Sequence, residues 1–213
     1  MAGPEEVMSG PHALTDLAQL RGVVGAESPA VRTKLFDELE ETALGFVKRS
    51  PFLLLATADA QGRPDVTPRG DDPGFVHASD PRTLWIPERK GNRMVLALQN
   101  VIANPHVALI FLVPGTEETL RVHGRASLRS DPEVLERLVA RGQPALLAIR
   151  VEVERCFFHC AKAFKRSRLW QPATWSAPLR ISFGKLLARR LGGGTELEQG
   201  IDRAIAEDYE NNL

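Results

Sequence analysis

The sequence has little cysteine, no long apolar run and no net charge, and each lack excludes a class of protein. Its 213 residues include two cysteines, Cys156 and Cys160, which are too few for a framework of disulfides and fit a reducing compartment. No run of about 18 apolar residues is present, and residues 1–16 lack the apolar segment of a signal peptide. We therefore expect a cytoplasmic protein that does not associate with membranes.

The charge balance argues against a nucleic-acid partner. Lys plus Arg and Asp plus Glu each number 27, so no overall field attracts the chain to nucleic acid. Hydrophobic residues make up 43% and charged residues 25%, which is ordinary for a soluble globular protein with a substantial core. Any site for an anion must therefore be local.

Six segments have the alternation or the short apolar runs of β-strands. They span residues 52–58, 65–69, 83–87, 106–113, 119–128 and 145–153. The first two flank a turn at Asp59 to Gly62, which is typical of a hairpin. Strands in this order predict a mainly β fold with α-helices (α+β), in which antiparallel strands form a barrel rather than a parallel sheet.

Helices are predicted between and around these strands. Apolar residues at helical spacing predict a helix over 31–48 and another over 94–104, which ends before Pro105. A third begins at Asp131 and Pro132, with the aspartate as its N-cap.

The two ends of the chain differ from the middle. After Glu154 the sequence is irregular, and a glycine link at 192–194 leads to a terminal helix. We expect an N-terminal arm over 1–30, one main domain over 31–175, and a C-terminal extension over 176–213.

Two cationic segments are candidates for binding an anion. Arg69 ends a strand beside Gly70, where the backbone can approach a ligand, although a solvated arginine is the alternative. Arg89, Lys90 and Arg93 surround a glycine where a strand leads into a helix. Guanidinium groups and helical N–H groups bind phosphate, and basic residues at a helix start need an anion to offset the helix dipole. A charged surface loop is the alternative.

A third cationic segment lies on the strand over 119–128. Arg121, His123 and Arg125 share one face of this strand because side chains alternate with a period of two. A half-buried cationic stripe is unfavourable unless something negative covers it. The alternatives are that the stripe faces solvent or that His123 acts as a catalytic base.

The segment from Cys156 to Cys160 contains His159 and could suggest zinc or haem. Its spacing does not match known ligand motifs and no second Cys/His pair exists, so we expect no metal site but small buried thiols. Lys162, Arg166 and Trp170 follow at intervals of four and would share one face of a helix. They would contact a ligand or form a surface stripe.

Motifs of hydrolases and nucleotide triphosphatases are absent from a supporting context. The motifs that are present resemble, in their order, those of the FMN-binding family related to pyridoxamine 5'-phosphate oxidase. They are SPFLLLATAD (50–59), GRP (62–64), PRGD (68–71), IPERKGNR (86–93), NP (104–105), LIFLVPG (109–115) and LRVHGRA (120–126). The similarity covers about residues 30–175, and the segment after Cys156 resembles one FMN-dependent branch of that class.

This resemblance implies a six-stranded antiparallel split β-barrel with flanking helices, and a homodimer with two FMN molecules at its interface. It implies FMN contacts for Thr67, Pro68, Arg69, Ile86, Pro87, Arg89, Lys90, Asn92, Arg93, Arg121, Lys162, Arg166 and Trp170. Thr67 to Arg69 and Arg89 to Arg93 would grip the flavin phosphate, with either Arg89-Lys90 or Asn92-Arg93 as the matching pair. The main chain near Ile86 would lie along the flavin ring, and Lys162, Arg166 and Trp170 would come from the partner subunit. We expect the phosphate-binding cations to lack acidic partners.

The resemblance further implies an FMN-dependent oxidoreductase that exchanges hydride between flavin N5 and a small-molecule substrate, without a protein nucleophile. The contacts that bind the vitamin B6 substrate in the oxidase are not recognisable here, so the substrate stays open. One alternative is a flavin-binding protein or sensor without catalytic activity. The other is a split barrel that binds haem or another tetrapyrrole through His123 or His159.

Overall fold

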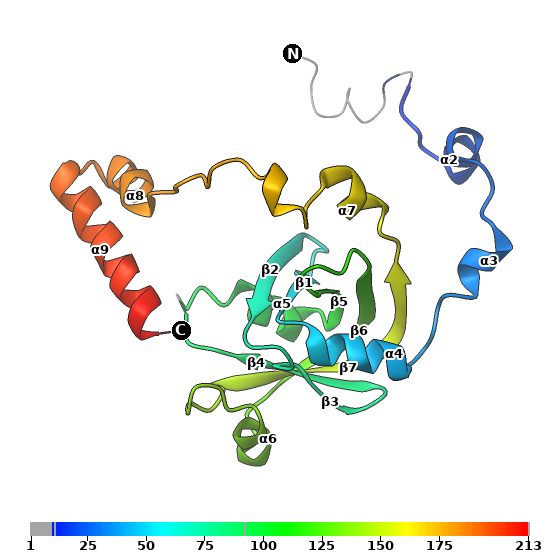
Figure 1. The fold of residues 1–213 in the computed structure, drawn as a ribbon, viewed down its shortest axis with the longest axis horizontal. Helices are drawn as coiled ribbons and strands as arrows, with labels where there is room; N and C mark the ends of the chain where they lie inside the picture. The colour runs from blue at the N-terminus through cyan, green and yellow to red at the C-terminus, as the bar shows by residue number, and fades with distance from the viewer. Residues whose placement is uncertain (1–9, 11, 92, 213) are drawn as a thin grey trace. The chain divides into compact units, whose positions relative to one another are not determined.

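The computed structural model describes residues 10, 12–91 and 93–212. Contacts divide the chain into two units, and the first ends at Leu35. It contains helices α2 (Leu17–Val24) and α3 (Pro29–Arg32), neither of which buries a residue. The second unit begins at Phe36 and contains the sheet and the remaining helices (Figure 1).

The second unit is a mixed α/β structure around one antiparallel sheet. Among the described residues the sheet has seven strands in the order β2-β1-β5-β6-β7-β4-β3. They are β1 (Phe52–Ala58), β2 (Pro64–Gly70), β3 (His77–Asp80), β4 (Thr83–Glu88), β5 (His106–Leu112), β6 (Thr119–Arg129) and β7 (Leu147–His159). The prediction of six strands was wrong because it missed β3. That strand has one apolar residue and no alternation, and it forms by pairing with β4.

Helices flank this sheet and extend beyond it. They are α4 (Glu41–Arg49), α5 (Leu96–Ala103), α6 (Pro132–Arg137), α7 (Lys162–Ser167), the 3₁₀ turn η1 (Pro172–Thr174), α8 (Phe183–Leu191) and α9 (Thr195–Asn211). The predicted helices before Pro105, after Asp131 and at the C-terminus are confirmed, whereas α8 was not predicted. In the described part of the chain, no helix combines the length and the apolar character needed to cross a bilayer.

The core lies inside the curve of the sheet. Alternate side chains of the strands point inward and are at most 1% exposed, among them Leu53, Leu55, Leu109, Phe111, Leu120, Val122, Leu84, Ile86, Ile149 and Val151. Helix α4 adds Ala43 and Val47 to this cluster. Burial of this much apolar surface is the main favourable term in folding.

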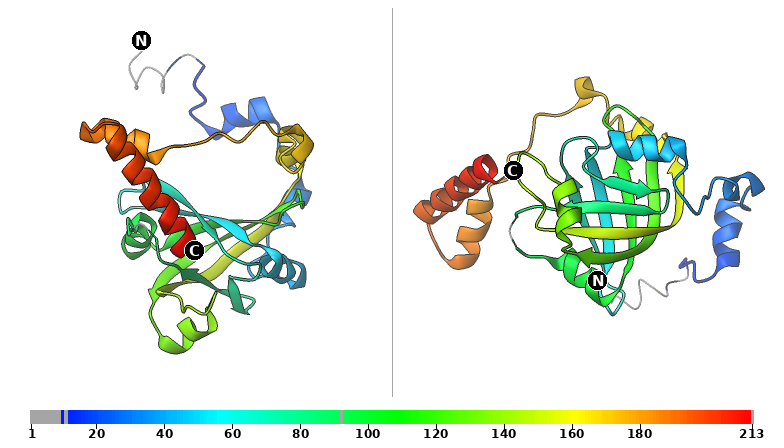
Figure 2. Two further views of the ribbon diagram at one scale, coloured as in Figure 1. Left: turned by 60° about the vertical axis from the view of Figure 1, so that its left-hand side comes forward. Right: turned by 90° about the horizontal axis from the view of Figure 1, so that it is seen from below.

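The sheet curls but does not close. Its edges are β2 and β3, and β3 pairs with β4 only as far as Trp85. Beyond Trp85, β4 approaches β2, as the ion pair between Arg69 of β2 and Glu88 of β4 shows. Figure 2 shows the curled sheet from two sides. We call the gap between β2 and residues 86–88 of β4 the seam.

The single helix predicted over residues 31–48 was wrong. Helix α3 ends at Arg32, α4 begins at Glu41, and Phe36 between them forms a bridge with Cys156. The amide of Phe36 donates to the carbonyl of Cys156 at 3.0 Å, and the reciprocal bond is 2.7 Å long. Pairing with a distant strand therefore outweighs the local helical pattern.

The prediction that the chain becomes irregular after Glu154 was also wrong, because β7 continues to His159. A bulge pairs Arg155 with His123 and Val153 with Gly124, so that Glu154 has no partner in this register. The extra residue breaks the alternation on which a strand prediction depends. A side chain at Gly124 would lie 2.0 Å from the carbonyl oxygen of Glu152, so the bulge requires glycine there.

Candidate functional site

A pocket opens at the seam, where several of the predicted cations meet. Its volume is about 370 Å³, and it lies between β2, the loop from β4 to α5 and the start of β7. Its lining includes Thr67, Arg69, Glu88, Arg89, Gly91, Arg93, Leu96, Leu146 and Leu147. The structure thus brings together Thr67, Arg69, Arg89 and Arg93, which the sequence placed in two separate segments. We call this cavity the seam pocket.

Two of these cations have carboxylate partners, so the expectation that they lack acidic partners was wrong. Arg69 pairs with Glu88, and the two side chains are 16% and 18% exposed. Arg89 Nε donates to Asp71 Oδ2 at 3.0 Å. Because these partners lie 18 and 19 residues apart in sequence, the fold and not local spacing brings them together. Both arginines are therefore fixed in direction before any ligand binds.

Asp71 is the most enclosed of these groups. Its side chain is 2% exposed, and Arg141 Nη2 approaches its other oxygen, Oδ1, at 3.0 Å. Arg89 also donates from Nη1 to the carbonyl of Leu138 at 2.7 Å. Sequence reasoning missed Asp71, Glu88 and Arg141 as site residues, although the PRGD motif contains the first of them.

The pocket retains polar groups without protein partners. Arg69 Nε is buried and, among the described residues, has no hydrogen-bond partner. Arg93 and Val95 in the adjoining loop have left-handed backbones, with φ of 60° and 48°. Such angles are unfavourable for a β-branched residue and cluster at binding sites. Two half-buried arginines, Arg69 and Arg89, a constrained loop and an apolar wall at Leu146 and Leu147 suit a ligand with an anionic group and an apolar body.

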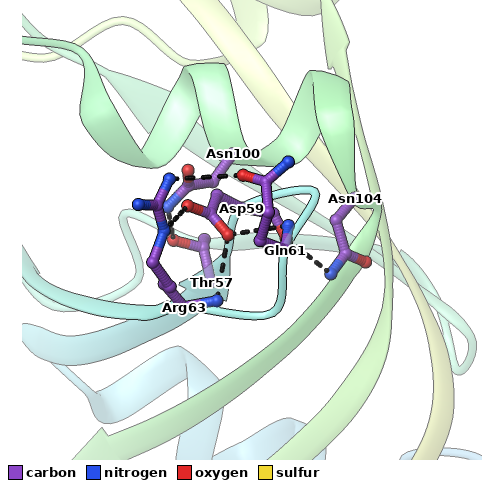
Figure 3. A network of polar contacts seen from close by, with 6 residues as sticks. All are labelled: Thr57, Asp59, Gln61, Arg63, Asn100 and Asn104. Carbon is purple, nitrogen blue, oxygen red and sulfur yellow. Dashed lines mark hydrogen bonds and ion pairs between the residues drawn. The ribbon is translucent and has the colours of Figure 1, made fainter.

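Helix α5, which begins at the pocket, is hydrogen-bonded to the end of β1, just before the turn between β1 and β2 (Figure 3). Asp59 closes that turn by accepting hydrogen bonds from Gln61 N and Arg63 N, both at 2.9 Å. Asn100 of α5 then donates to Thr57 Oγ1 at 3.0 Å. This network fixes the helix whose first turn lines the pocket.

The other residues predicted around the flavin phosphate lie close by. Pro68, Pro87 and Lys90 line an adjoining cavity of about 220 Å³ that shares Arg69 and Arg89 with the seam pocket. Lys90 Nζ also donates to Asn212 Oδ1 at 2.5 Å. The side chain of Ile86 is fully buried in the core, so only its main chain could meet a ligand. Asn92 lies outside the described residues.

Arg121, His123 and Arg125 share the outer face of β6, as the alternation predicts, because the residues between them are buried. They do not line the seam pocket. Arg121 lies over the ring of Phe157, with its guanidinium carbon 5.2 Å from the ring centre. Within the described structure, neither Arg121 Nε nor His123 Nε2 has a partner, although both atoms are buried. Burial lowers the pKa of His123, and the charges of Arg121 and Arg155 lower it further.

The segment after β7 differs from its prediction. Helix α7 ends at Ser167, and Arg168 has a left-handed backbone, so Trp170 does not share a helical face with Lys162 and Arg166. Instead, Trp170 Nε1 donates to the carbonyl of Thr116 at 2.8 Å. This contact fixes α7 against the turn between β5 and β6, away from the seam pocket of the same chain. Lys162 and Arg166 are exposed.

The two cysteines have different surroundings. Cys156 is buried, and its Sγ donates to the carbonyl of Glu38 at 3.0 Å. Burial raises the pKa of this thiol, and Glu40 and Asp37 add to the effect. Cys160 is exposed, so the prediction of two buried thiols holds for one of them. Within the described ranges, no three His, Cys, Asp or Glu side chains form a group that could hold a metal ion.

Several solved structures are similar to parts of this chain. A putative pyridoxamine 5'-phosphate oxidase from Lactobacillus delbrueckii is 25% identical, with a TM-score of 0.44 over 57% of this chain and 95% of that chain. An FMN-binding protein from Syntrophomonas wolfei is 10% identical, with a TM-score of 0.44 over 55% of this chain and 86% of that chain. HutZ, the haem storage protein from Vibrio cholerae, is 18% identical, with a TM-score of 0.38 over 56% of this chain and 93% of that chain. These scores are too low to transfer a cofactor.

A family model gives the stronger result. The model described as pyridoxamine 5'-phosphate oxidase matches residues 39–160, a range that contains all seven strands and the seam pocket. The match covers more than half of the chain and includes the motifs on which the resemblance was based. The protein belongs to the pyridoxamine 5'-phosphate oxidase family.

Proposed function

We propose that this protein binds FMN in the seam pocket as a split-barrel homodimer and acts as an FMN-dependent oxidoreductase on a small-molecule substrate. The observation that carries the proposal is the convergence of Thr67, Arg69, Arg89 and Arg93 on one pocket. Its volume of about 370 Å³ lies within the usual range for sites of small ligands and cofactors.

The residues of the pocket fit the two ends of FMN. The phosphate would meet Arg69, whose buried Nε lacks a partner in the described chain, and Arg93, which is exposed and forms no ion pair with a described residue. The apolar ring would lie between Leu146, Leu147 and the edge of β4 that β3 leaves uncovered after Trp85. Ile86 and Pro87 would contribute main-chain atoms there.

FMN, when bound, supplies the hydride and electron chemistry, and the protein supplies binding, orientation and exclusion of water. The pairs Arg69–Glu88 and Arg89–Asp71 hold the cations in one geometry, which lowers the entropy lost when an anion binds. The chain needs no nucleophile for this role, so we assign no catalytic residue.

A second copy of the chain would complete the site. The outer face of β1 and β2 exposes the apolar side chains of Phe52 at 39% and Val66 at 58%, and half-buried Ile110 and Leu112 of β5 continue it. Adjacent to it, Arg121 has a buried Nε that no described residue satisfies. An isologous dimer through this face would cover the apolar surface and bring Arg121, Lys162, Arg166 and Trp170 of one subunit to the other's pocket. Light scattering during gel filtration tests the dimer.

The absorbance spectrum of the purified protein tests the cofactor. The proposal predicts that the purified protein shows the absorbance bands of flavin, or that it shows them after incubation with FMN. A colourless protein that binds no FMN would contradict it. Catalysis is tested separately by mixing the flavin-loaded protein with a reduced nicotinamide. Tight FMN binding without flavin reduction or reoxidation would instead favour the non-catalytic flavin binder.

Haem binding is the second candidate, through His123 or His159. His159 is exposed at the end of β7, so iron could reach it, whereas His123 Nε2 is buried. A Soret band on haem titration that disappears in His159→Ala would support this candidate. The seam pocket favours FMN because several cations line one cavity and His159 is not among its lining residues.

A further inference from the structure

We propose that Asp71 is a positioning residue that acts through Arg89 to make the pocket prefer phosphorylated flavin over unphosphorylated flavin. This inference rests on the proposed FMN site and deepens it. Asp71 itself does not line the seam pocket, whereas Arg89 does.

The geometry around Asp71 uses both of its carboxylate oxygens. Oδ2 accepts from Arg89 Nε at 3.0 Å, and Oδ1 accepts from its neighbour Asp72 N at 2.9 Å. Arg141 Nη2 lies 3.0 Å from the same Oδ1. With 2% of its side chain exposed, Asp71 is a buried anion that two cations neutralise, which is the condition under which a buried charge is tolerated.

The guanidinium group of Arg89 donates hydrogen bonds from two of its three nitrogens. Nε is bound to Asp71 and Nη1 to the carbonyl of Leu138 at 2.7 Å. Nη2 has no partner among the described residues, and Arg89 lines the seam pocket. A guanidinium is planar, so two fixed nitrogens fix the direction of the third. Asp71 thereby keeps one N–H group of Arg89 available for an anion.

The same carboxylate joins three segments of the chain. Asp71 follows β2, Arg89 follows β4, and Arg141 lies between α6 and β7 with a left-handed backbone. The last segment leads directly into Leu146 and Leu147, the apolar wall of the pocket. Without Asp71, Arg89 would regain its rotamer freedom and an anion would have to order it again.

The experiment compares FMN and riboflavin, which differ only by the phosphate. Dissociation constants are measured for the full-length protein and for Asp71→Asn, with Asp72→Asn as the matched control. Asp72 is exposed and next in sequence. We expect Asp71→Asn to weaken FMN binding by about tenfold or more and riboflavin binding by less than about twofold, as loss of one charge-assisted hydrogen bond implies. Asp72→Asn should change neither constant.

Equal weakening of both flavins would overturn the inference, because it would show that Asp71 only maintains the fold. If Asp71→Asn does not fold, Arg89→Lys replaces it, since lysine keeps the charge but cannot donate to Asp71, Leu138 and an anion in this geometry. The dissociation constant for riboflavin divided by that for FMN must then be lower in Arg89→Lys than in the wild type. An unchanged ratio would overturn the inference.

A readout without flavin separates this inference from the proposed function. The Nε–H resonance of Arg89, assigned by its loss in Arg89→Lys, is followed during titration with inorganic pyrophosphate. We expect saturable shifts in the wild type that are lost in Asp71→Asn and retained in Asp72→Asn. If the wild type binds pyrophosphate but no flavin, the proposed function and the flavin preference fail, whereas the positioning of Arg89 by Asp71 stands. No response of Arg89 in the wild type would overturn the role of Asp71.

Discussion

The seam pocket and the outer face of β6 both carry arginines, but they differ in what neutralises them. In the pocket, Arg69 pairs with Glu88 and Arg89 with Asp71. On the outer face, Arg121 and His123 form no ion pair with a described residue, and each has a buried nitrogen atom without a partner, as Arg69 Nε also has in the pocket. The first set is organised by the chain itself, whereas the second is unfavourable until another molecule covers it. Net charge alone would not distinguish these two cases.

Removal of a pocket carboxylate should give the largest effect. We expect Glu88→Ala to lower the free energy of unfolding by about 3 kcal/mol, because it leaves Arg69 partly buried without its partner. Urea unfolding measures this change, and Glu88→Gln should cost less because the amide still accepts a hydrogen bond. A loss below about 1 kcal/mol for Glu88→Ala would remove the contrast between the two regions.

Removal of an outer-face cation should act on assembly instead of folding. Arg121→Gln should change the free energy of unfolding of the chain by less than about 1 kcal/mol, since the arginine has no carboxylate partner to lose. It should raise the dissociation constant of the proposed dimer by about tenfold. Analytical ultracentrifugation over a range of concentrations measures the second effect. Destabilisation as large as that of Glu88→Ala would contradict the assignment.

The lowered pKa of His123 predicts a dependence of stability on pH. Burial, Arg121 and Arg155 all disfavour its charged form in the folded chain. The unfolded chain therefore binds a proton at a higher pH than the folded chain does, so the stability contribution of His123 is lost as pH falls below the ordinary range of histidine. Urea unfolding at pH 7.5 and 5.5 provides the test. Between these two values the free energy of unfolding should decrease less for His123→Asn than for the wild type. Equal decreases would indicate that His123 is not affected by its neighbours.

An exposed ion pair should give the smallest effect. Arg129 contacts Asp131 at 2.7 Å, but the two side chains are 48% and 41% exposed. We expect Arg129→Ala to change the free energy of unfolding by less than about 0.5 kcal/mol, because solvent screens such pairs. A loss comparable to that of Glu88→Ala would show that burial does not explain the difference between ion pairs in this protein.

Patterns local in sequence predicted most of the sheet. Alternation and short apolar runs located six strands, and the motifs placed Thr67, Arg69, Arg89 and Arg93, which the fold brings to one pocket. What local patterns could not supply were contacts between distant residues. The bridge from Phe36 to Cys156 interrupts a helical pattern, and the bulge at Glu154 interrupts a strand pattern.

The same limit applies to the site. Asp71 and Arg141 are 70 positions apart, and nothing in either segment alone indicates that they meet. Short β3 likewise depends on β4 rather than on its own sequence. For this reason the structure has seven strands where six were predicted, and two of the cations expected to be unpaired, Arg69 and Arg89, have carboxylate partners.

The most direct test of the central claim is a calorimetric titration of the protein with FMN, run in parallel on Arg69→Gln. We predict that the wild type binds one FMN per chain with saturation. The affinity of the variant should be at least about tenfold lower, because the phosphate would lose the charge-assisted hydrogen bond from the Arg69 guanidinium. Equal FMN affinities for the wild type and Arg69→Gln, or no binding to either, would contradict the assignment of the seam pocket.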